Sequence, residues 1–352
     1  MKMQDTQQTI NIPIFQQAKL FRYRLPFKTP LLFKGMKLRA REGVILQVEN
    51  DSGEFNFAEI APLPGFSRES LQQAIAQMIT VLNNHPLDQN EKNTAVLNKQ
   101  NDMTLYPSVA FALDCIVHNL PISELFKTAA SIPLLQGDNH NVLKQYLQLN
   151  KPDRIKLKVA RQPVAEDITL FSALSALNHN LLIRCDANQS WSFAQADLFF
   201  AHINHKVLDH IEEPTASLND NIALAERYQV QLALDETLQQ PQFHYQHQPC
   251  FKTLILKPTL IGSFARLNYF IKIAKEFHLS VSISSSFESP LGLKQLASVA
   301  GQWSKEVDIS CGLDTLKFFE SELLYKMLDQ KLDKKTPLSQ QVKQLECVWT
   351  SN

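Results

Sequence analysis

Six charged residues stand at or near the ends of short apolar runs in the middle of the chain, and their types suit one kind of chemistry. In chain order they are Lys156, Lys158, Asp186, Glu212, Asp235 and Lys257. Carboxylate oxygens are the ligands that Mg²⁺ and Mn²⁺ prefer, so three acids from three successive runs predict a divalent-metal site. A bound cation can hold a substrate carboxylate and stabilise the charge that develops when the adjacent carbon loses a proton. The pattern therefore predicts an enzyme that removes a proton next to a carboxylate.

The lysines supply the acid and base for such a reaction. Lys156 and Lys158 are two residues apart, so on a strand both ammonium groups point to the same side. Burial, a neighbouring ammonium and a metal ion each lower a lysine pKa from its usual value of about 10.4, which makes Lys158 the predicted general base. Lys257 is expected on the opposite face, as a second acid or base or as a cation facing the developing charge. The alternative, with Lys156 and Lys158 pointing outward beneath helices, would provide no base.

A particular scaffold would bring these residues together. Eight short apolar runs begin near Pro133, Ile155, Leu182, Asp209, Leu232, Thr253, Leu279 and Val307. Amphipathic segments, such as residues 193–203 and 264–277, lie between most of them. Strands alternating with helices at this interval are typical of a (β/α)₈ barrel, in which reactive groups lie at the carboxyl ends of the strands.

The first part of the chain follows a different pattern and is predicted to be a small α+β unit over residues 1–120. Residues 15–27, 43–50 and 55–63 have the patterning of strands, and the turn residues at 51–53 predict a hairpin between the last two. The basic stretch at 34–42 is interpreted as a loop, either a solvated connection or a lid that carries cations.

Two helices are expected after these strands. Ser67 is the predicted N-cap of the first, whose apolar residues from Leu71 to Leu82 have helical spacing. Pro107 is expected in the first turn of the second.

Composition excludes several classes of protein. Lys plus Arg and Asp plus Glu are both 35, so the chain has no net charge and lacks the basic field that nucleic-acid binding uses. The five cysteines are far apart and form no Cys-x-x-Cys pair. No apolar run has the length of a signal peptide or a membrane span. We expect a cytoplasmic enzyme with a small anionic substrate and no nucleic-acid or membrane partner, and prefer a monomer to a homo-oligomer.

These motifs together resemble the enolase superfamily, in its muconate-lactonising subgroup. The resemblance rests on the Lys-x-Lys run and on the strand ends Asp-Ala-Asn, Glu-Glu-Pro, Leu-Asp-Glu and Lys-Pro, and it extends to the segments 59–71, 109–117, 256–263, 283–293 and 309–316. It implies an α/β fold, a modified (β/α)₈ TIM-type barrel of the (β/α)₇β kind, at 121–320. An N-terminal α+β capping domain would comprise residues 1–120, joined by the C-terminal tail at about 321–352. The implied cofactor is Mg²⁺, with Mn²⁺ as the alternative.

The resemblance also implies a role for each site residue. Asp186, Glu212 and Asp235 would be the metal ligands, with Glu213 as second choice in the Glu-Glu-Pro motif. Lys158 would remove the α-proton and later protonate the departing hydroxyl, and Lys257 would face the enediolate.

Further residues are expected around this centre. Arg184 would pair with the metal-binding acids, Ser284 and Gly312 would meet the succinyl part of the substrate, and Lys156 and Asn188 complete the predicted substrate-binding set. Two departures from the family pattern stand out: Gln189-Ser190 where Arg-Ala is common, and Pro290 where a small residue such as Ser is expected.

The segments that carry the resemblance imply a hydro-lyase of menaquinone biosynthesis. Its reaction would be the syn dehydration of 2-succinyl-6-hydroxy-2,4-cyclohexadiene-1-carboxylate to an aromatic acid through an enediolate. An N-acylamino acid racemase or a dipeptide epimerase of the same superfamily is the alternative, because lysines on opposite faces suit that chemistry too. The run 310–314 lacks the Asp-x-Asp motif usual in dipeptide epimerases, which favours the lyase. A non-catalytic binding barrel is the remote alternative.

Overall fold

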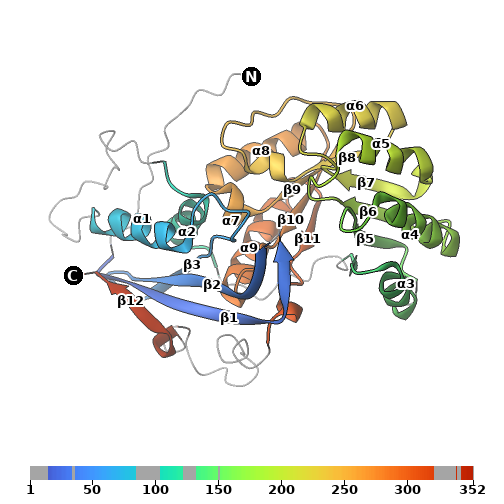
Figure 1. Ribbon diagram of the computed structural model, residues 1–352. Helices are drawn as coiled ribbons and strands as arrows, with labels where there is room; N and C mark the ends of the chain where they lie inside the picture. Colours follow the sequence, from blue (N-terminus) through green and yellow to red (C-terminus); the bar gives the residue numbers. More distant parts are fainter. Residues whose placement is uncertain are drawn as a thin grey trace.

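In the computed structural model, the described part of the chain is organised around two sheets with helices packed against them (Figure 1). The structure describes residues 15–33, 36–84, 104–121, 132–149, 151–320, 338 and 342–351. Within these residues, no helix is long and apolar enough to cross a membrane.

The first sheet is antiparallel and built from both ends of the chain. Its strands are β1 (Gln17–Phe33), β2 (Met36–Glu49), β3 (Phe55–Ile60) and β12 (Glu346–Thr350), in the order β12-β1-β2-β3. The predicted hairpin is confirmed: β2 and β3 pair from Val44–Ile60 to Glu49–Phe55. In its turn, the Asn50 side chain accepts hydrogen bonds from the backbone of Ser52 and Glu54, and Gly53 takes the left-handed φ of 78° that the turn requires.

The prediction of a loop at 34–42 is wrong for residues 36–42, which form the first half of β2. They pair with β1, for example Leu38 with Leu31 and Arg41 with Leu25. The Arg41 side chain is buried and donates hydrogen bonds to the backbone carbonyls of Ala61, Pro62 and Phe287, so it cannot act as a lid cation. Exposed hairpin strands carry many charged residues, which makes them resemble loops in a sequence. Residues 34 and 35 lie outside the described residues.

Two helices cover this sheet, α1 (Leu71–Asn83) and α2 (Pro107–Val117). The N-cap of α1 is Ser70 and not Ser67: the Ser70 hydroxyl accepts from the Gln73 N–H, and the Gln73 side chain accepts from the Ser70 N–H. The Ser67 hydroxyl instead accepts from the Leu63 N–H in the preceding turn. Pro107 begins α2, as predicted.

The second sheet consists of eight parallel strands arranged in chain order from β4 to β11 and curled into a half-barrel. All eight predicted strand positions are confirmed. The strands are β4 (Leu134–Leu135), β5 (Arg154–Lys158), β6 (Leu182–Asp186), β7 (Leu208–Glu212), β8 (Leu232–Leu234), β9 (Phe251–Leu256), β10 (Ser280–Ser284) and β11 (Ile309–Gly312). In the part of the chain that the structure describes, no ladder joins β4 to β11.

Helices between the strands cover the outside of this sheet (Figure 1). They are α3 (Asn139–Gln148), α4 (Val164–Leu177), α5 (Phe193–His202), α6 (Leu218–Tyr228), α7 (Pro258–Ile261), α8 (Phe264–Glu276) and α9 (Pro290–Trp303). Short 3₁₀ turns lie at His205–Val207, Glu236–Gln239, Leu316–Phe318 and Val342–Gln344. The two amphipathic segments singled out in the sequence correspond to α5 and α8.

The alternation along β5 decides which side chains face the barrel interior. Ile155 and Leu157 are fully buried in the main hydrophobic core. Lys156 and Lys158 point to the other side, where they meet acids from β6 and β7. The alternative in which both lysines point outward is therefore wrong.

The two sheets are joined by several contacts. Phe27 of β1 bridges to Phe319 beyond β11, and α2 packs against α7. Within the first sheet, the C-terminal strand β12 pairs with β1. The C-terminal end thus returns to the first sheet. The exact boundaries at 120 and 320 stay predictions.

Candidate active site

Three acids meet at the carboxyl ends of three neighbouring strands. Asp186 is the last residue of β6, Glu212 is the last residue of β7, and Asp235 directly follows β8. Asp186 and Glu212 are register partners, and their carboxyl groups are in hydrogen-bonding contact. All three residues are at most 2% exposed, so their charges are held away from solvent.

Two lysines approach the acids from β5. The Lys156 Nζ lies 2.8 Å from Asp186 Oδ2 and 2.7 Å from Glu212 Oε2. The Lys158 Nζ donates to Asp186 Oδ2 at 2.6 Å and to Asn188 Oδ1 at 2.8 Å. Asn188 in turn donates its amide to Glu236 Oε1 at 3.1 Å, which fixes the orientation of its oxygen toward the lysine.

Lys257 approaches from the other side. It directly follows β9, four strands from β5 in the sheet order, and its Nζ lies 2.5 Å from Asp235 Oδ2. Asp235 Oδ1 accepts from the Gln239 side chain at 3.2 Å. The acids therefore lie between Lys158 and Lys257.

The surroundings of the three lysines do not shift their pKa values in the same direction. Burial, together with the neighbouring Lys156 ammonium, lowers the pKa of Lys158 even though Asp186 acts against the change. Burial would also lower the pKa of Lys156, but Asp186 and Glu212 outweigh it and raise the pKa. The pKa of Lys257 is raised in the same way, because Asp235 and Glu236 outweigh burial. Of the three, Lys158 is the one that most readily gives up its proton.

The acids are perturbed by their closeness to one another. Burial and the Asp186 carboxylate raise the pKa of Glu212 to about 8. Burial acts in the same direction on Asp186, but Lys156 and Lys158 outweigh it and hold the pKa of that carboxyl well below its usual range. This crowding of negative charge needs cations to balance it.

The donor chemistry at this point fits a hard divalent cation. Buried carboxylate oxygens from three strands are the ligand set that Mg²⁺ and Mn²⁺ prefer. The contact between Asp186 and Glu212 brings two carboxyl groups together. A bound cation stabilises such a pair, and in its absence a proton on one carboxyl group must do so. Among the described residues, no three His, Cys, Asp or Glu side chains are arranged to hold a metal ion as they stand, and all three acids are paired with lysine ammonium groups.

Ser284 and Gly312 lie side by side on β10 and β11, where they are register partners. A Cβ at Gly312 would lie 3.3 Å from Ser284 Oγ, so the glycine leaves open the space beside the hydroxyl. Their predicted role toward a substrate remains a proposal.

The prediction for Arg184 needs correction, because its side chain pairs with a different acid, Asp209. Its Nε donates to Asp209 Oδ2 at 2.8 Å, and Lys252 pairs with the same carboxylate. Arg184 is two residues before Asp186 and in register with Lys156 and His210, so it lies one layer deeper in the barrel. This deeper position places the Arg184 side chain beside Asp209, at the start of β7.

Sequence reasoning missed the part that Glu213 plays. It was the second choice for a metal ligand, but its carboxylate is turned to the backbone after β8, where it accepts hydrogen bonds from Asp235 and Thr237. Burial and the nearby Glu236 raise its pKa to about 7. The Glu-Glu-Pro motif marks the position, but nothing in its spacing reveals the direction of the side chain.

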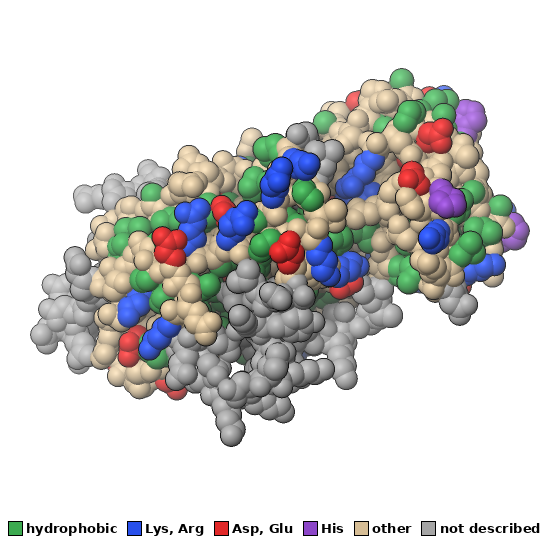
Figure 2. All heavy atoms as spheres, turned by 60° about the horizontal axis from the view of Figure 1, so that its bottom comes forward, with side chains coloured by type: hydrophobic (Ala, Val, Ile, Leu, Met, Phe, Trp, Pro, Cys, Tyr) green, Lys and Arg blue, Asp and Glu red, His purple; other side chains and the backbone are tan. Residues whose placement is uncertain are grey.

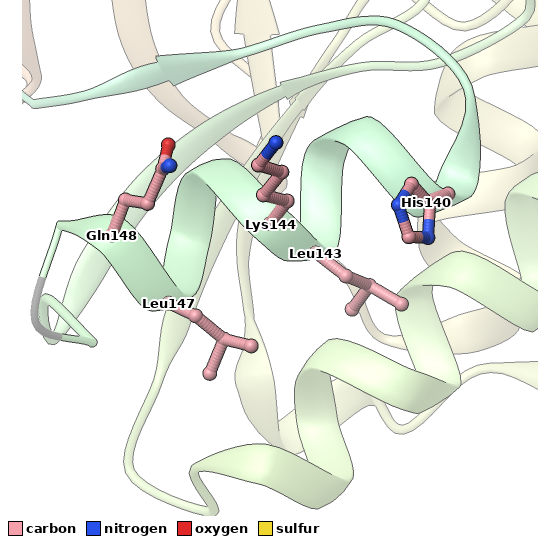
Figure 3. Close-up of a pocket in the computed structure, with 5 residues that line it drawn as sticks. All are labelled: His140, Leu143, Lys144, Leu147 and Gln148. Carbon is pink, nitrogen blue, oxygen red and sulfur yellow. The ribbon is translucent and has the colours of Figure 1, made fainter.

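A separate hollow lies on the outside of the barrel. Figure 3 shows that all its lining residues belong to α3 and that Leu143 and Leu147 project from the same side of that helix. It contains none of the residues at the strand ends. Figure 2 shows acidic and basic side chains interspersed over another face, in keeping with the absence of net charge.

The fold and site together define a barrel protein of the enolase class, with acids on successive strands between two lysines. Comparisons with known proteins agree. Residues 15–120 match the family described as MenC, N-terminal domain, and residues 141–330 match the enolase C-terminal domain-like family. The chain is 30% identical to the o-succinylbenzoate synthase of Yersinia enterocolitica, over 95% of this chain and 99% of that protein. It is 31% identical to that of Photorhabdus laumondii, over 87% of this chain and 92% of that protein.

This chain belongs to the o-succinylbenzoate synthase family of the enolase superfamily. Solved structures share its fold. The o-succinylbenzoate synthase of Thermosynechococcus elongatus, complexed with Mg, has a TM-score of 0.64 at 21% identity and covers 87% of this chain and 94% of its own. A dipeptide epimerase of Cytophaga hutchinsonii, complexed with Mg and a dipeptide, has a TM-score of 0.68 at 18% identity and covers 88% and 89%.

Proposed function

We propose that the protein is an enzyme that catalyses the syn dehydration of 2-succinyl-6-hydroxy-2,4-cyclohexadiene-1-carboxylate to 2-succinylbenzoate, a step of menaquinone biosynthesis. The observation that carries the proposal is the match to o-succinylbenzoate synthases over nearly the whole of both chains, at 30% to 31% identity. The lysines on both sides of the buried acids support it, because the reaction needs a base and a stabilised negative charge.

The proposed base is Lys158. Its amine lies inside the barrel at the carboxyl end of β5, and its lowered pKa increases the neutral fraction that can accept a proton. After taking the proton from the carbon next to the substrate carboxylate, its ammonium form can protonate the departing hydroxyl on the same face. Asn188 holds the amine in place through its side-chain oxygen.

The other two lysines are proposed to stay charged. The carboxylates around Lys156 and Lys257 favour their ammonium forms. Lys257 would face the enediolate that forms when the proton leaves, from the side opposite the base. Lys156 would offset the charge of the acids and lower the pKa of Lys158.

Asp186, Glu212 and Asp235 are the proposed ligands of Mg²⁺, with Mn²⁺ as the alternative. When bound, the cation would supply positive charge for the substrate carboxylate. The acids themselves fix the position of Lys158 and Lys257 through the ion pairs described above.

A racemase or epimerase is the second candidate, because solved dipeptide epimerases share the fold and lysines on both faces suit proton exchange. The end of β11 argues against it. A substrate amine needs acidic partners there, but Asp314 is an exposed carboxylate already paired with Lys317 at 2.7 Å.

The test is a direct assay of the purified protein with Mg²⁺ on three substrates. Aromatisation is followed with the cyclohexadiene carboxylate, and racemisation with an N-succinylamino acid and an L-Ala-L-Glu dipeptide. We expect turnover of the first substrate to dominate. Epimerisation of the dipeptide without any aromatic product would refute the proposal in favour of the second candidate.

A further inference from the structure

Glu213 occupies an unusual place beside the acid cluster. It follows Glu212 directly, is 1% exposed, and has a left-handed backbone φ of 24°, which non-glycine residues adopt only where the surroundings require it. This turn of the backbone directs its side chain away from Asp186 and Glu212. A buried carboxylate in such a position must find donors elsewhere.

The donors come from the loops after the two adjacent strands. Glu213 Oε1 accepts from the Asp235 N–H at 2.8 Å and from the Thr237 N–H at 3.0 Å, both in the loop after β8. Glu213 Oε2 accepts from the side-chain amide of Gln189, in the loop after β6. A single carboxylate therefore links the loops that follow three successive strands.

Backbone hydrogen bonds strengthen the same link. The Gln189 N–H donates to the Glu213 carbonyl at 3.0 Å, and the Glu213 N–H donates to the Ala233 carbonyl on β8 at 3.3 Å. Asp235 has an irregular backbone, with φ −130° and ψ −84°, and so lies outside the regular ladder of its strand. The Glu213 carboxylate replaces the ladder as the partner of the Asp235 N–H.

We propose that Glu213 is a positioning residue, which holds the backbone of Asp235 so that the Asp235 carboxylate can serve the divalent cation and pair with Lys257. This inference rests on the assignment of Asp235 as a ligand in the proposed function. It makes the second acid of the Glu-Glu-Pro motif a hydrogen-bond acceptor for its neighbour and not a ligand. What matters is the acceptor oxygen, not the charge of the side chain.

Two variants of similar size separate these roles. Glu213→Gln removes the charge but keeps an oxygen for the Asp235 and Thr237 N–H groups, and the Gln189 amide can turn to pair with the new amide. Glu213→Met removes both the charge and the acceptors. Glu226→Gln, on the exposed face of α6, is the control for the loss of one negative charge.

The measurement is the affinity of the full-length protein for Mg²⁺ alone, by isothermal titration calorimetry without substrate. We expect Glu213→Gln and the control to bind within about threefold of the wild type, and Glu213→Met to bind about 10- to 100-fold more weakly, the range usual for a lost partner of a metal ligand. Kinetics should show the same order in kcat, with a smaller change in KM. If Glu213→Met does not fold, Glu213→Asp provides a second test, since it keeps the charge but shortens the side chain, withdraws the carboxylate from the Asp235 and Thr237 N–H groups, and should weaken Mg²⁺ binding.

Equal losses in Glu213→Gln and Glu213→Met would overturn the proposal, because they would show that the charge matters. Wild-type affinity in Glu213→Met would overturn it as well. Since binding is measured without turnover, the result is independent of which substrate the enzyme uses. A protein that binds Mg²⁺ but fails to dehydrate the cyclohexadiene substrate would refute the proposed function and leave this inference standing.

Discussion

At the scale of single residues, neighbouring carboxylates decide which lysine can act as a base. Lys156 and Lys158 lie on the same side of one strand, yet their pKa values shift in opposite directions. Lys156 contacts two carboxylates, Asp186 and Glu212, whereas Lys158 contacts one carboxylate and the neutral amide of Asn188. The spacing in the sequence identifies the pair, but only the contacts distinguish its members.

The metal assignment is tested by removing one ligand oxygen at a time. Asp186→Asn, Glu212→Gln and Asp235→Asn should each weaken Mg²⁺ binding by at least about tenfold, because each replaces a charged hard oxygen ligand with a neutral amide. Calorimetry measures the affinity. Excess EDTA should abolish activity, and full activity in its presence would contradict the metal assignment.

At the scale of secondary-structure elements, the barrel strands could be predicted because they are short and buried. Leu232–Leu234 is entirely apolar, Phe251–Leu256 has four apolar residues of six, and each run is followed by a polar residue at the strand end. The first half of β2 could not be recognised, because exposed hairpin residues show no such contrast. Arg184 was placed on the correct strand, but its depth in the barrel, and therefore its pairing with Asp209, depends on the strand register.

The pairing of β10 with β11 predicts the effect of a larger side chain at Gly312. Gly312→Ala would put a methyl group 3.3 Å from Ser284 Oγ, in the space proposed for the succinyl group. We expect KM for the cyclohexadiene substrate to rise about tenfold, equivalent to about 1.4 kcal/mol of lost binding, with little change in kcat. Steady-state kinetics provide the measurement, and Ser310→Ala on the same strand is the control. A fall in kcat with an unchanged KM would contradict the assigned role.

At the scale of the whole molecule, buried polar contacts tie the N-terminal sheet to the barrel. Glu59 of β3 accepts hydrogen bonds from the Tyr23 hydroxyl and from the Ser289 N–H at the start of α9. Gln295 of α9 donates to the Phe57 carbonyl, and Asp114 of α2 accepts from the Phe264 N–H at the start of α8. These contacts fix the position of the sheet relative to the loop between β10 and α9, next to Ser284.

Glu59 should make the stability of the protein depend on pH. Burial, with a contribution from Glu288, raises its pKa above the usual value of 4.5, so the folded state holds this proton more tightly than the unfolded state. Its contribution to stability is complete below the unfolded pKa and is lost as the pH rises through the folded pKa. Relative to Glu59→Gln, the wild type should therefore lose stability above about pH 4.5, by at most about 1.4 kcal/mol per pH unit. Urea unfolding from pH 4.5 to 8 measures this difference, and parallel profiles for the two proteins would contradict it.

The central claim is that Lys158 is the general base and that Lys257 acts as a cation facing the enediolate. The most direct test compares the rates of dehydration by the Lys158→Ala and Lys257→Arg variants. We predict that Lys158→Ala loses dehydration, a fall of at least about 10³-fold, because the other amine on that side, Lys156, is held in its ammonium form by Asp186 and Glu212 and cannot accept the proton. Lys257→Arg keeps a positive charge but cannot readily accept a proton, so it should retain weakened dehydration and lose any racemisation of an N-acylamino acid. An active Lys158→Ala enzyme would contradict the account.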